Sequence, residues 1–277
     1  MFKQVVLGVL LSIVSSFAFA QNFLSWQLND RYFTTQVGAG FASYRGELKH
    51  NGSIQNEISN LSLGVEARLL PKIGVRFEVG RYNIRGHDKH APDSSFAKQR
   101  NLSFKSANYE ASIQGIFFLN KYAANYTKRP KCDPYLLLGI GGTYISPTTT
   151  LGGEKYNLFD TKTESTDYNR LTLIIPAGAG LKWKINPFTN LSTEITYRYT
   201  FSDFLDDVSG DFPESYPDIT TELLSNRKDE IPMVNQAAYD QLIPGSPRGD
   251  DNNKDAYLFL NFKLEWYFPP DLFAKKK

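Results

Sequence analysis

The feature of this sequence that most constrains its fold is an alternation of apolar and polar side chains with a period of two. This alternation places successive side chains on opposite faces of a β-strand, so that one face is apolar and the other polar. The clearest case spans residues 60–84, where two alternating runs flank a short turn at Leu70-Pro71-Lys72. The sequence therefore predicts a β-hairpin in this region.

The same pattern recurs along the chain and predicts eight strands. Their expected ranges are about 33–44, 60–69, 73–84, 104–119, 135–145, 169–184, 191–200 and 256–268. Eight is an even number, and each run has roughly the ten residues that a tilted strand needs to cross a membrane. Short connections near 70–72, 120–134 and 185–190 alternate with long ones near 45–59, 85–102, 146–168 and 201–254. We therefore predict an all-β domain over residues 21–277: an eight-stranded antiparallel up-and-down transmembrane β-barrel with long extracellular loops.

The first twenty residues have the features of a secretory signal peptide. Lys3 precedes an apolar run over residues 5–17, and Ala18-Phe19-Ala20 is typical of a cleavage site. The run is too short for a membrane-spanning helix, which needs about 20 apolar residues. We expect a cleaved signal peptide over residues 1–20 and export beyond the inner membrane.

Composition narrows the possible partners. The formal net charge of +2 does not indicate a nucleic-acid partner. Cys132 is the only cysteine, so an internal disulfide is excluded, and we interpret it as a free, unreactive thiol. The 20 Phe and 16 Tyr residues favour strands and interfacial aromatic rings over helices.

The polar strand faces carry ten charged residues of balanced sign, which we expect to pair inside the barrel because an unpaired buried charge is costly. They are Glu66, Arg68, Arg76, Glu78, Glu110, Lys182, Glu194, Arg198, Lys263 and Glu265. Aromatic residues lie near strand ends on the apolar faces: Tyr144, Trp183, Tyr199, Trp266 and Phe268. Both observations favour a membrane barrel. A soluble periplasmic β-sandwich is the alternative. An eight-stranded barrel would be filled by side chains and would not form an open diffusion pore.

Several loop motifs suggest ligand sites. The carboxylates of Asp203, Asp206 and Asp207 are candidates for calcium binding, but we favour capping and hydrogen bonding to loop amides, because a full set of calcium ligands is not evident. The segment His87-Asp88-Lys89-His90 offers two imidazoles to a metal but lacks further spaced ligands. We therefore expect no metal or other cofactor to be required.

Other motifs favour structural roles. Arg248-Gly249-Asp250 matches an adhesion tripeptide but lies in a turn-rich stretch, and the Gly-rich segments 139–142 and 178–180 do not open helices as phosphate-binding loops do. We expect these glycines to relieve crowding in a narrow barrel. Segments 219–226 and 233–242 are expected to form short helices that fold the last long loop over the barrel mouth.

Four segments together resemble a known family. They are residues 43–48 (SYRGEL), 175–183 (IPAGAGLKW), 197–209 (YRYTFSDFLDDVS), and the Arg248–Asp250 tripeptide upstream of Asp255–Tyr257. They resemble a family of Bacteroidota outer-membrane β-barrels that includes PorG of the type IX secretion system, and the stretch FSDFLDDVS is the most specific part. The resemblance spans nearly the whole mature chain. It implies a membrane anchor that contacts a periplasmic ring of lipoprotein and partner subunits, and it implies no catalytic residue.

Our leading hypothesis is a non-enzymatic outer-membrane anchor or docking component that serves type IX secretion. Expected partners are outer-membrane lipids, periplasmic secretion-ring proteins and, during insertion, the barrel-assembly machinery, for which the aromatic last strand resembles a recognition signal. The docking surface would include Lys121, Lys128, Arg129 and Lys131, together with the C-terminal lysines 275–277. Two other classes stay open: a surface ligand-binding or adhesion barrel that uses loop 201–254, and a hydrolase or acyltransferase that uses the loop histidines His50, His87 and His90.

Overall fold

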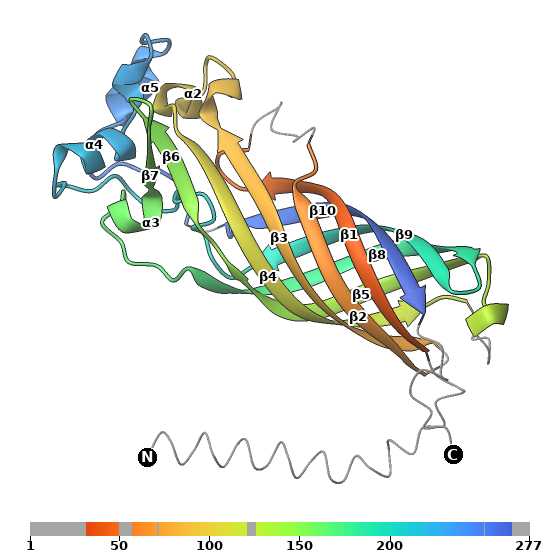
Figure 1. The fold of residues 1–277 in the computed structure, drawn as a ribbon. Helices are drawn as coiled ribbons and strands as arrows, with labels where there is room; N and C mark the ends of the chain where they lie inside the picture. Colours follow the sequence, from red (N-terminus) through yellow and green to blue (C-terminus); the bar gives the residue numbers. More distant parts are fainter. Residues whose placement is uncertain (1–31, 50–56, 71, 121–125, 252, 268–277) are drawn as a thin grey trace, which may run out of the picture.

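Eight antiparallel strands close into a barrel in the computed structural model, which describes residues 32–49, 57–70, 72–120, 126–251 and 253–267 (Figure 1). In ring order the strands are β1 (Tyr32–Arg45), β2 (Asn60–Leu70), β3 (Ile73–His87), β4 (Ser103–Phe118), β5 (Cys132–Tyr144), β8 (Leu171–Asn186), β9 (Thr189–Thr200) and β10 (Ala256–Tyr267). Each strand pairs with its neighbours along the chain, and β1 pairs with β10 to close the ring. The predicted eight-stranded up-and-down barrel is confirmed.

The connections differ strongly between the two ends of the barrel. At one end, here called the short-turn end, β2 joins β3 and β8 joins β9 through two residues each. The connection between β4 and β5 at that end contains the 3-10 helix η3 (Tyr126–Lys128). The other end, here called the cap end, carries the four long connections (Figure 1). None of the helices in the described ranges is long and apolar enough to cross a membrane.

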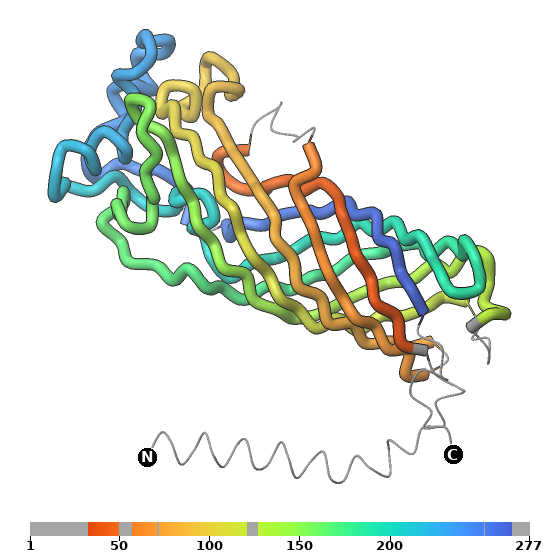
Figure 2. The backbone as a smooth tube through the Cα atoms, viewed as in Figure 1, coloured from red at the N-terminus to blue at the C-terminus, as the bar shows by residue number. Residues whose placement is uncertain are grey.

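The described parts of the four long connections form a folded cap. It contains η2 (Asp88–His90), α2 (Phe96–Arg100), the hairpin β6 (Pro147–Leu151) and β7 (Glu154–Asn157), α3 (Leu158–Thr161), α4 (Ile219–Ser225), η4 (Lys228–Glu230) and α5 (Gln236–Gln241). Helices α4 and α5 lie within the two segments expected to be helical. The β6–β7 hairpin was not predicted, and it continues the sheet because β6 pairs with β4. Figure 2 shows β3 and β4 running from the short-turn end into this cap.

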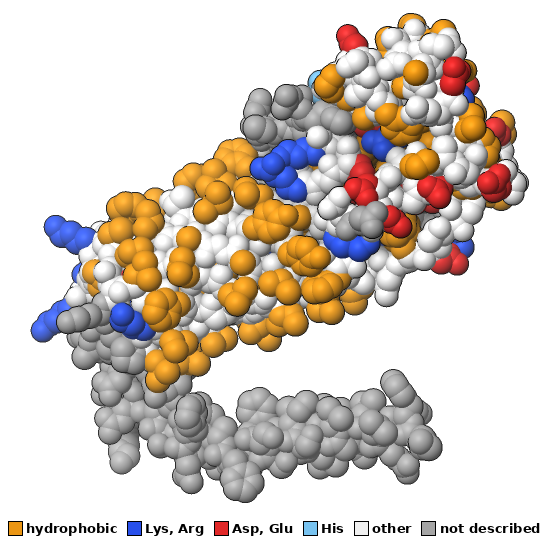
Figure 3. Space-filling model, turned by 180° about the vertical axis from the view of Figure 1, so that it is seen from behind, with side chains coloured by type: hydrophobic (Ala, Val, Ile, Leu, Met, Phe, Trp, Pro, Cys, Tyr) orange, Lys and Arg blue, Asp and Glu red, His pale blue; other side chains and the backbone are white. Residues whose placement is uncertain are grey.

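Period-two alternation places apolar side chains on the outside of the barrel wall. Leu63, Phe77 and Leu138 are 57%, 50% and 62% exposed, which would be costly in water for so many residues at once. Figure 3 shows hydrophobic side chains covering the barrel face that it draws, with Lys and Arg side chains at both borders of this apolar belt. The wall therefore has the surface of a transmembrane barrel and not of a soluble sandwich.

The alternation reverses its sense within single strands. On β3 the outward positions are apolar from residue 73 to residue 79, whereas the outward positions at 81, 83 and 85 are Arg, Asn and Arg. Inward positions change in the opposite direction, because Glu78 is buried in the lumen but Tyr82 and Ile84 are buried below the cap. Towards the cap, the strand therefore has polar side chains outside and apolar side chains inside, as in a water-soluble protein. This reversal marks one border of the apolar belt.

The interior consequently has two layers. The layer towards the short-turn end is polar, whereas the cap end holds an apolar core that combines barrel residues with loop residues. Members of this core include Tyr44, Tyr82, Phe104, Ile174, Leu205, Val208 and Phe259. The expectation of a polar interior therefore holds for only part of the lumen. The cap loops fold into the barrel mouth, and inward side chains at that level pack against loop side chains such as Leu205.

Candidate functional site

The lumen contains one continuous chain of ion pairs. Nine of the ten predicted interior charges alternate in sign along it, in the order Glu265, Lys182, Glu66, Arg76, Glu194, Lys263, Glu78, Arg198 and Glu110. The tenth, Arg68, pairs with Asp133 at 3.0 Å nearer the short-turn end. Every one of these side chains is buried. Each cation of the chain lies between two carboxylates, so no unpaired cation is left in a confined, poorly solvated space.

The centre of the chain is the most tightly connected part. Arg76 lies 3.0 Å from Glu66 and 2.6 Å from Glu194, and Lys263 lies 2.9 Å from the second oxygen of Glu194. Glu194 also accepts a hydrogen bond of 2.7 Å from the hydroxyl of Tyr135. Arg76 and Glu194 come from β3 and β9, on different sides of the ring, so their side chains cross the lumen. They seal its middle.

Two lumen tyrosines were missed by the sequence reasoning. The hydroxyl of Tyr135 donates to Glu194, and the hydroxyl of Tyr257 donates to Glu110 at 2.8 Å. Both have the parity of the polar face, and this was the signal that could have identified them. Gly180 is opposite Tyr135, and a Cβ atom at Gly180 would lie 2.4 Å from the Tyr135 ring. At this position the glycine does relieve crowding.

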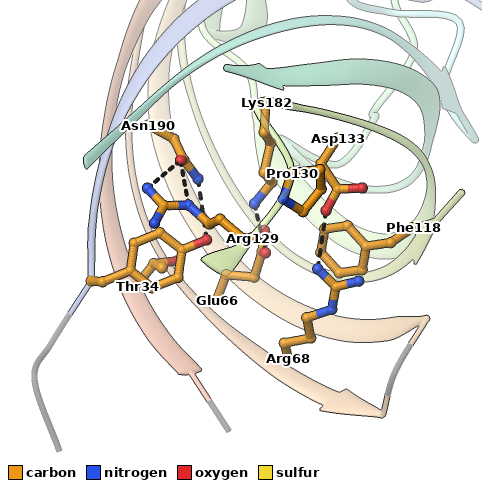
Figure 4. Close-up of a pocket in the computed structure, with 10 residues that line it drawn as sticks. Thr34, Glu66, Arg68, Phe118, Arg129, Pro130, Asp133, Lys182 and Asn190 are labelled. Atoms are coloured by element: carbon orange, nitrogen blue, oxygen red, sulfur yellow. Dashed lines mark hydrogen bonds and ion pairs between the residues drawn. The ribbon is translucent and has the colours of Figure 1, made fainter. Parts of the chain in front are cut away.

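Arg129 seals the short-turn end and is not a surface residue. Its guanidinium donates to the side chain of Asn190 at 2.7 and 2.9 Å (Figure 4). The same guanidinium donates to the backbone carbonyls of residues 186, 187 and 189, and it lies over the ring of Tyr267. The cavity beside it has a volume of only about 10 Å³, which is close to the space for one water molecule. The expectation that Arg129 presents its charge to a partner is therefore wrong for the free protein. The planar guanidinium is instead held by the turn between β8 and β9.

The other predicted docking residues have different positions. Lys128 and Lys131 are exposed at the short-turn end, on either side of the buried Arg129. Lys121 and the lysines 275–277 lie outside the described residues, as do His50, Phe268 and the predicted signal peptide 1–20. Two exposed lysines are thus the part of this basic element that the structure presents to solvent.

The cap is held together by buried charged groups. Asp88 and Arg100 form a two-point ion pair, with distances of 2.8 and 3.0 Å. Arg248 pairs with Glu164 at 2.7 Å and also donates to the carbonyl of Ser225. Because Arg248 is 2% exposed, the Arg248-Gly249-Asp250 tripeptide is structural. Asp88 is committed to Arg100, so it is not available with His87 and His90 as a metal ligand.

The three aspartates proposed for calcium do not share a site. Asp203 accepts a hydrogen bond from Ser209, Asp207 accepts from Thr163 and Tyr168, and Asp206 faces Tyr44. Asp206 and Asp207 lie in a bend, and Asp207 has a positive φ of 69°, so these neighbouring side chains point in different directions. A cluster in sequence therefore need not become a cluster in space.

Asp206 instead joins Glu47 and Asp255, which come from two other segments of the chain. Their carboxylate oxygens lie within 4.8 Å of one another, and they form the one group among the described residues that could hold a cation. The Tyr44 hydroxyl lies 2.6 Å from Asp206 and 2.8 Å from Asp255. A phenol has one proton to donate, so the Tyr44 hydroxyl donates to one of these carboxyls and can accept a hydrogen bond from the other when that carboxyl is protonated. We call Glu47, Asp206 and Asp255 the cap carboxyl cluster.

Burial accounts for protonation in this part of the cap. Desolvation, aided by the neighbouring carboxylates, raises the pKa of Glu47 to about 8, and desolvation raises the pKa of Asp206 to about 7. The pKa of Asp255 is raised well above its usual range by its burial and by the neighbouring carboxylates. Burial also raises the pKa of Asp207 to about 7. These raised pKa values favour the uncharged form of the carboxyls, which reduces the like-charge repulsion where three distant loop segments meet.

No protein-family model matches this chain, and comparison with curated proteins yields no match. Similar solved structures include neisserial surface protein A, with 12% identity and a TM-score of 0.41, covering 85% of this chain and 97% of that one. A major outer membrane protein of Thermus thermophilus has 14% identity and a TM-score of 0.44, covering 86% and 99%. The Yersinia pestis attachment invasion locus protein Ail, solved with the heparin analogue sucrose octasulfate, has 10% identity and a TM-score of 0.37, covering 86% and 97%. At these values the function must be inferred from the side chains of this barrel itself.

Proposed function

We propose that this chain is an integral protein of the bacterial outer membrane that acts as a non-enzymatic anchor, with its function located at its two ends. The sealed lumen is the observation that carries this conclusion. Arg76, Glu194 and Lys263 are completely or almost completely buried and cross the barrel interior, so that paired side chains fill the lumen at this level. The apolar belt supports the membrane location, since only helices and closed barrels satisfy their backbone in lipid.

We further propose that the short-turn end faces the periplasm and docks onto an acidic surface of a secretion-ring protein, as the resemblance to the PorG-containing family suggests. Bacterial barrels have short periplasmic turns and long external loops, and the described connections follow this rule. Lys128 and Lys131 are exposed cations at this end. Each contributes modestly, because exposed charges act mainly through steering and complementarity.

Charge reversal tests the docking proposal. The variant Lys128→Glu/Lys131→Glu should lose co-purification with the ring lipoprotein and should secrete less cargo, while the barrel keeps its heat-modifiable migration on gels. The matched control is Lys89→Glu/Lys254→Glu, which reverses two exposed lysines at the cap end. Equal co-purification of the two variants with the ring would exclude docking through this turn.

A second candidate function is recognition of a surface ligand by the cap. Ile219 and Leu223, one turn apart on α4, are 66% and 48% exposed, and Met233, Val234 and Ile243 are also exposed. These exposed apolar side chains lie on the cap, outside the apolar belt, and therefore favour contact with another protein. The variant Ile219→Asn/Leu223→Asn should lose surface binding but keep secretion, with Glu222→Gln on the same helix as its control. Loss of secretion with intact surface binding would favour periplasmic docking instead.

A further inference from the structure

A groove of about 320 Å³ on the outer wall near the cap gathers basic side chains from three strands. Arg85 of β3, Lys105 of β4 and Lys155 of β7 line it, together with a single carboxylate, that of Glu57. Lys105 and Lys155 are exposed, and Arg85 is half-buried. The groove therefore has an excess of positive charge and is open to the surroundings of the barrel.

The strand register places two of these cations directly opposite each other. Arg85 pairs with Lys105 across β3 and β4, which puts their Cβ atoms about 5 Å apart on the outward face. Like charges in this position are destabilising. Within the described ranges, neither residue, nor Lys155, has an ion pair with an Asp or Glu oxygen within 4.0 Å. An anion between the two side chains would remove this repulsion.

The position of the groove along the membrane normal indicates which layer of the membrane would supply that anion. Tyr109 is the last outward aromatic residue of β4 before the cap, and it is 57% exposed. Lys105 lies four residues closer to the cap, which corresponds to about 10 Å along the membrane normal for a strand tilted by about 40°. The groove therefore lies beside the headgroup layer, above the acyl chains. Ile58, which is 64% exposed, provides an apolar surface at the groove.

We propose that this groove binds a phosphate group of a phosphorylated glycolipid in the outer leaflet, an inference that rests on the proposed outer-membrane location. The guanidinium of Arg85 can hold a phosphate through two parallel hydrogen bonds, and the ammonium groups of Lys105 and Lys155 add compact positive charges. The lipid headgroup thus replaces the carboxylate partners that these cations lack. It also fixes the height of the barrel in the membrane.

Native mass spectrometry of the full-length barrel in non-ionic detergent tests this proposal. The probes are bis-phosphorylated lipid A, the same lipid without phosphates, and inorganic phosphate. The wild-type barrel should bind the phosphorylated lipid at least about tenfold more tightly than the dephosphorylated one, because each basic residue near an anionic headgroup adds to the affinity. The variant Arg85→Gln/Lys105→Gln/Lys155→Gln should lose this preference.

The control variant Lys128→Gln/Lys131→Gln removes two exposed lysines from the opposite end and should retain the preference for phosphorylated lipid. Equal binding of both lipids to the wild-type barrel, or an unchanged preference in the triple variant, would overturn the proposal. So would binding of inorganic phosphate without binding of the lipid. None of these three outcomes would contradict the proposed membrane anchor, provided that the barrel still requires detergent and keeps its heat-modifiable migration. Solubility without detergent would instead overturn the proposed anchor.

Discussion

Arg76 shows how one buried residue can tie several strands together. It comes from β3, contacts Glu66 of β2 and Glu194 of β9, and donates to Gln114 of β4. Its side chain is completely buried. A guanidinium suits this position because its planar fork carries five donors in fixed directions.

Truncating Arg76 should therefore destabilise the barrel more than an exposed substitution would. We expect Arg76→Met to lower the free energy of unfolding by about 3 kcal/mol, because it leaves two buried carboxylates with fewer partners. Arg76→Lys is the matched control, since it retains the charge but has fewer donors, and it should cost less. Denaturant titration of the barrel in lipid vesicles measures both. Equal stability of Arg76→Met and wild type would show that Lys182 and Lys263 neutralise the chain without Arg76.

At the scale of structural elements, the stability of the cap depends on pH. The segments that carry Glu47, Asp206 and Asp255 meet at carboxyl groups, two of which have pKa values raised to about 8 and about 7. A carboxyl with a raised pKa in the folded state favours folding while it is protonated. Its contribution is complete below the unfolded pKa of about 4 and is lost as the pH rises through the folded value.

We therefore expect the cap to loosen progressively as the pH rises from about 4 to about 8, while the barrel stays intact. The amides of Leu205 and Val208 donate to Asp255 and Asp206, so their protection factors in hydrogen exchange, each corrected for the intrinsic exchange rate at the same pH, should fall over this range. Glu47→Gln/Asp206→Asn, which imitates the protonated groups, should flatten the pH dependence. Asp167→Asn, at an exposed acid outside the cluster, should not. Protection factors that are independent of pH in the wild type would contradict this account of the cap.

At the scale of the whole molecule, the reversal of the alternation on β3 separates a lipid-facing wall from a water-facing one. Below the border the outside is apolar and the lumen is charged, and above it the outside is polar and the inside is apolar. Both zones belong to the same continuous sheet. The solvent around each zone therefore determines which face of the strand is apolar.

One pair of substitutions tests this division. Phe77→Arg, on the outward face of β3 within the belt, should lower the stability of the vesicle-inserted barrel by about 2–4 kcal/mol. Asn83→Arg, on the same face beyond the border, should change it by less than about 1 kcal/mol. In a water-soluble sandwich both positions would tolerate arginine. Similar losses for the two variants would place the border of the membrane elsewhere.

The eight strands of the barrel wall, and the side chains that share a face of each strand, could be predicted from the amino-acid sequence alone. Both are local properties, because parity along an extended chain needs no information from distant residues. This is why Glu66, Arg76 and Lys263 could be assigned to one face before any contact was known. The even strand number and the alternation of loop lengths follow from the same local pattern.

Which of these groups contact one another depends on how the strands pair and how the loops pack. The partners of Arg76 depend on the register of strands on opposite sides of the ring, and a shift of one residue would turn each side chain to the other face. Arg129 was assigned to the surface because its burial depends on a turn almost sixty residues away, which the local pattern does not reveal. The cap carboxyl cluster joins residues separated by up to 208 positions, with the proximity of Glu47, Asp206 and Asp255 set by barrel closure and loop packing. Contacts of this kind arise from the closed ring, which brings the first and last strands together, and they leave no periodic signal along the chain.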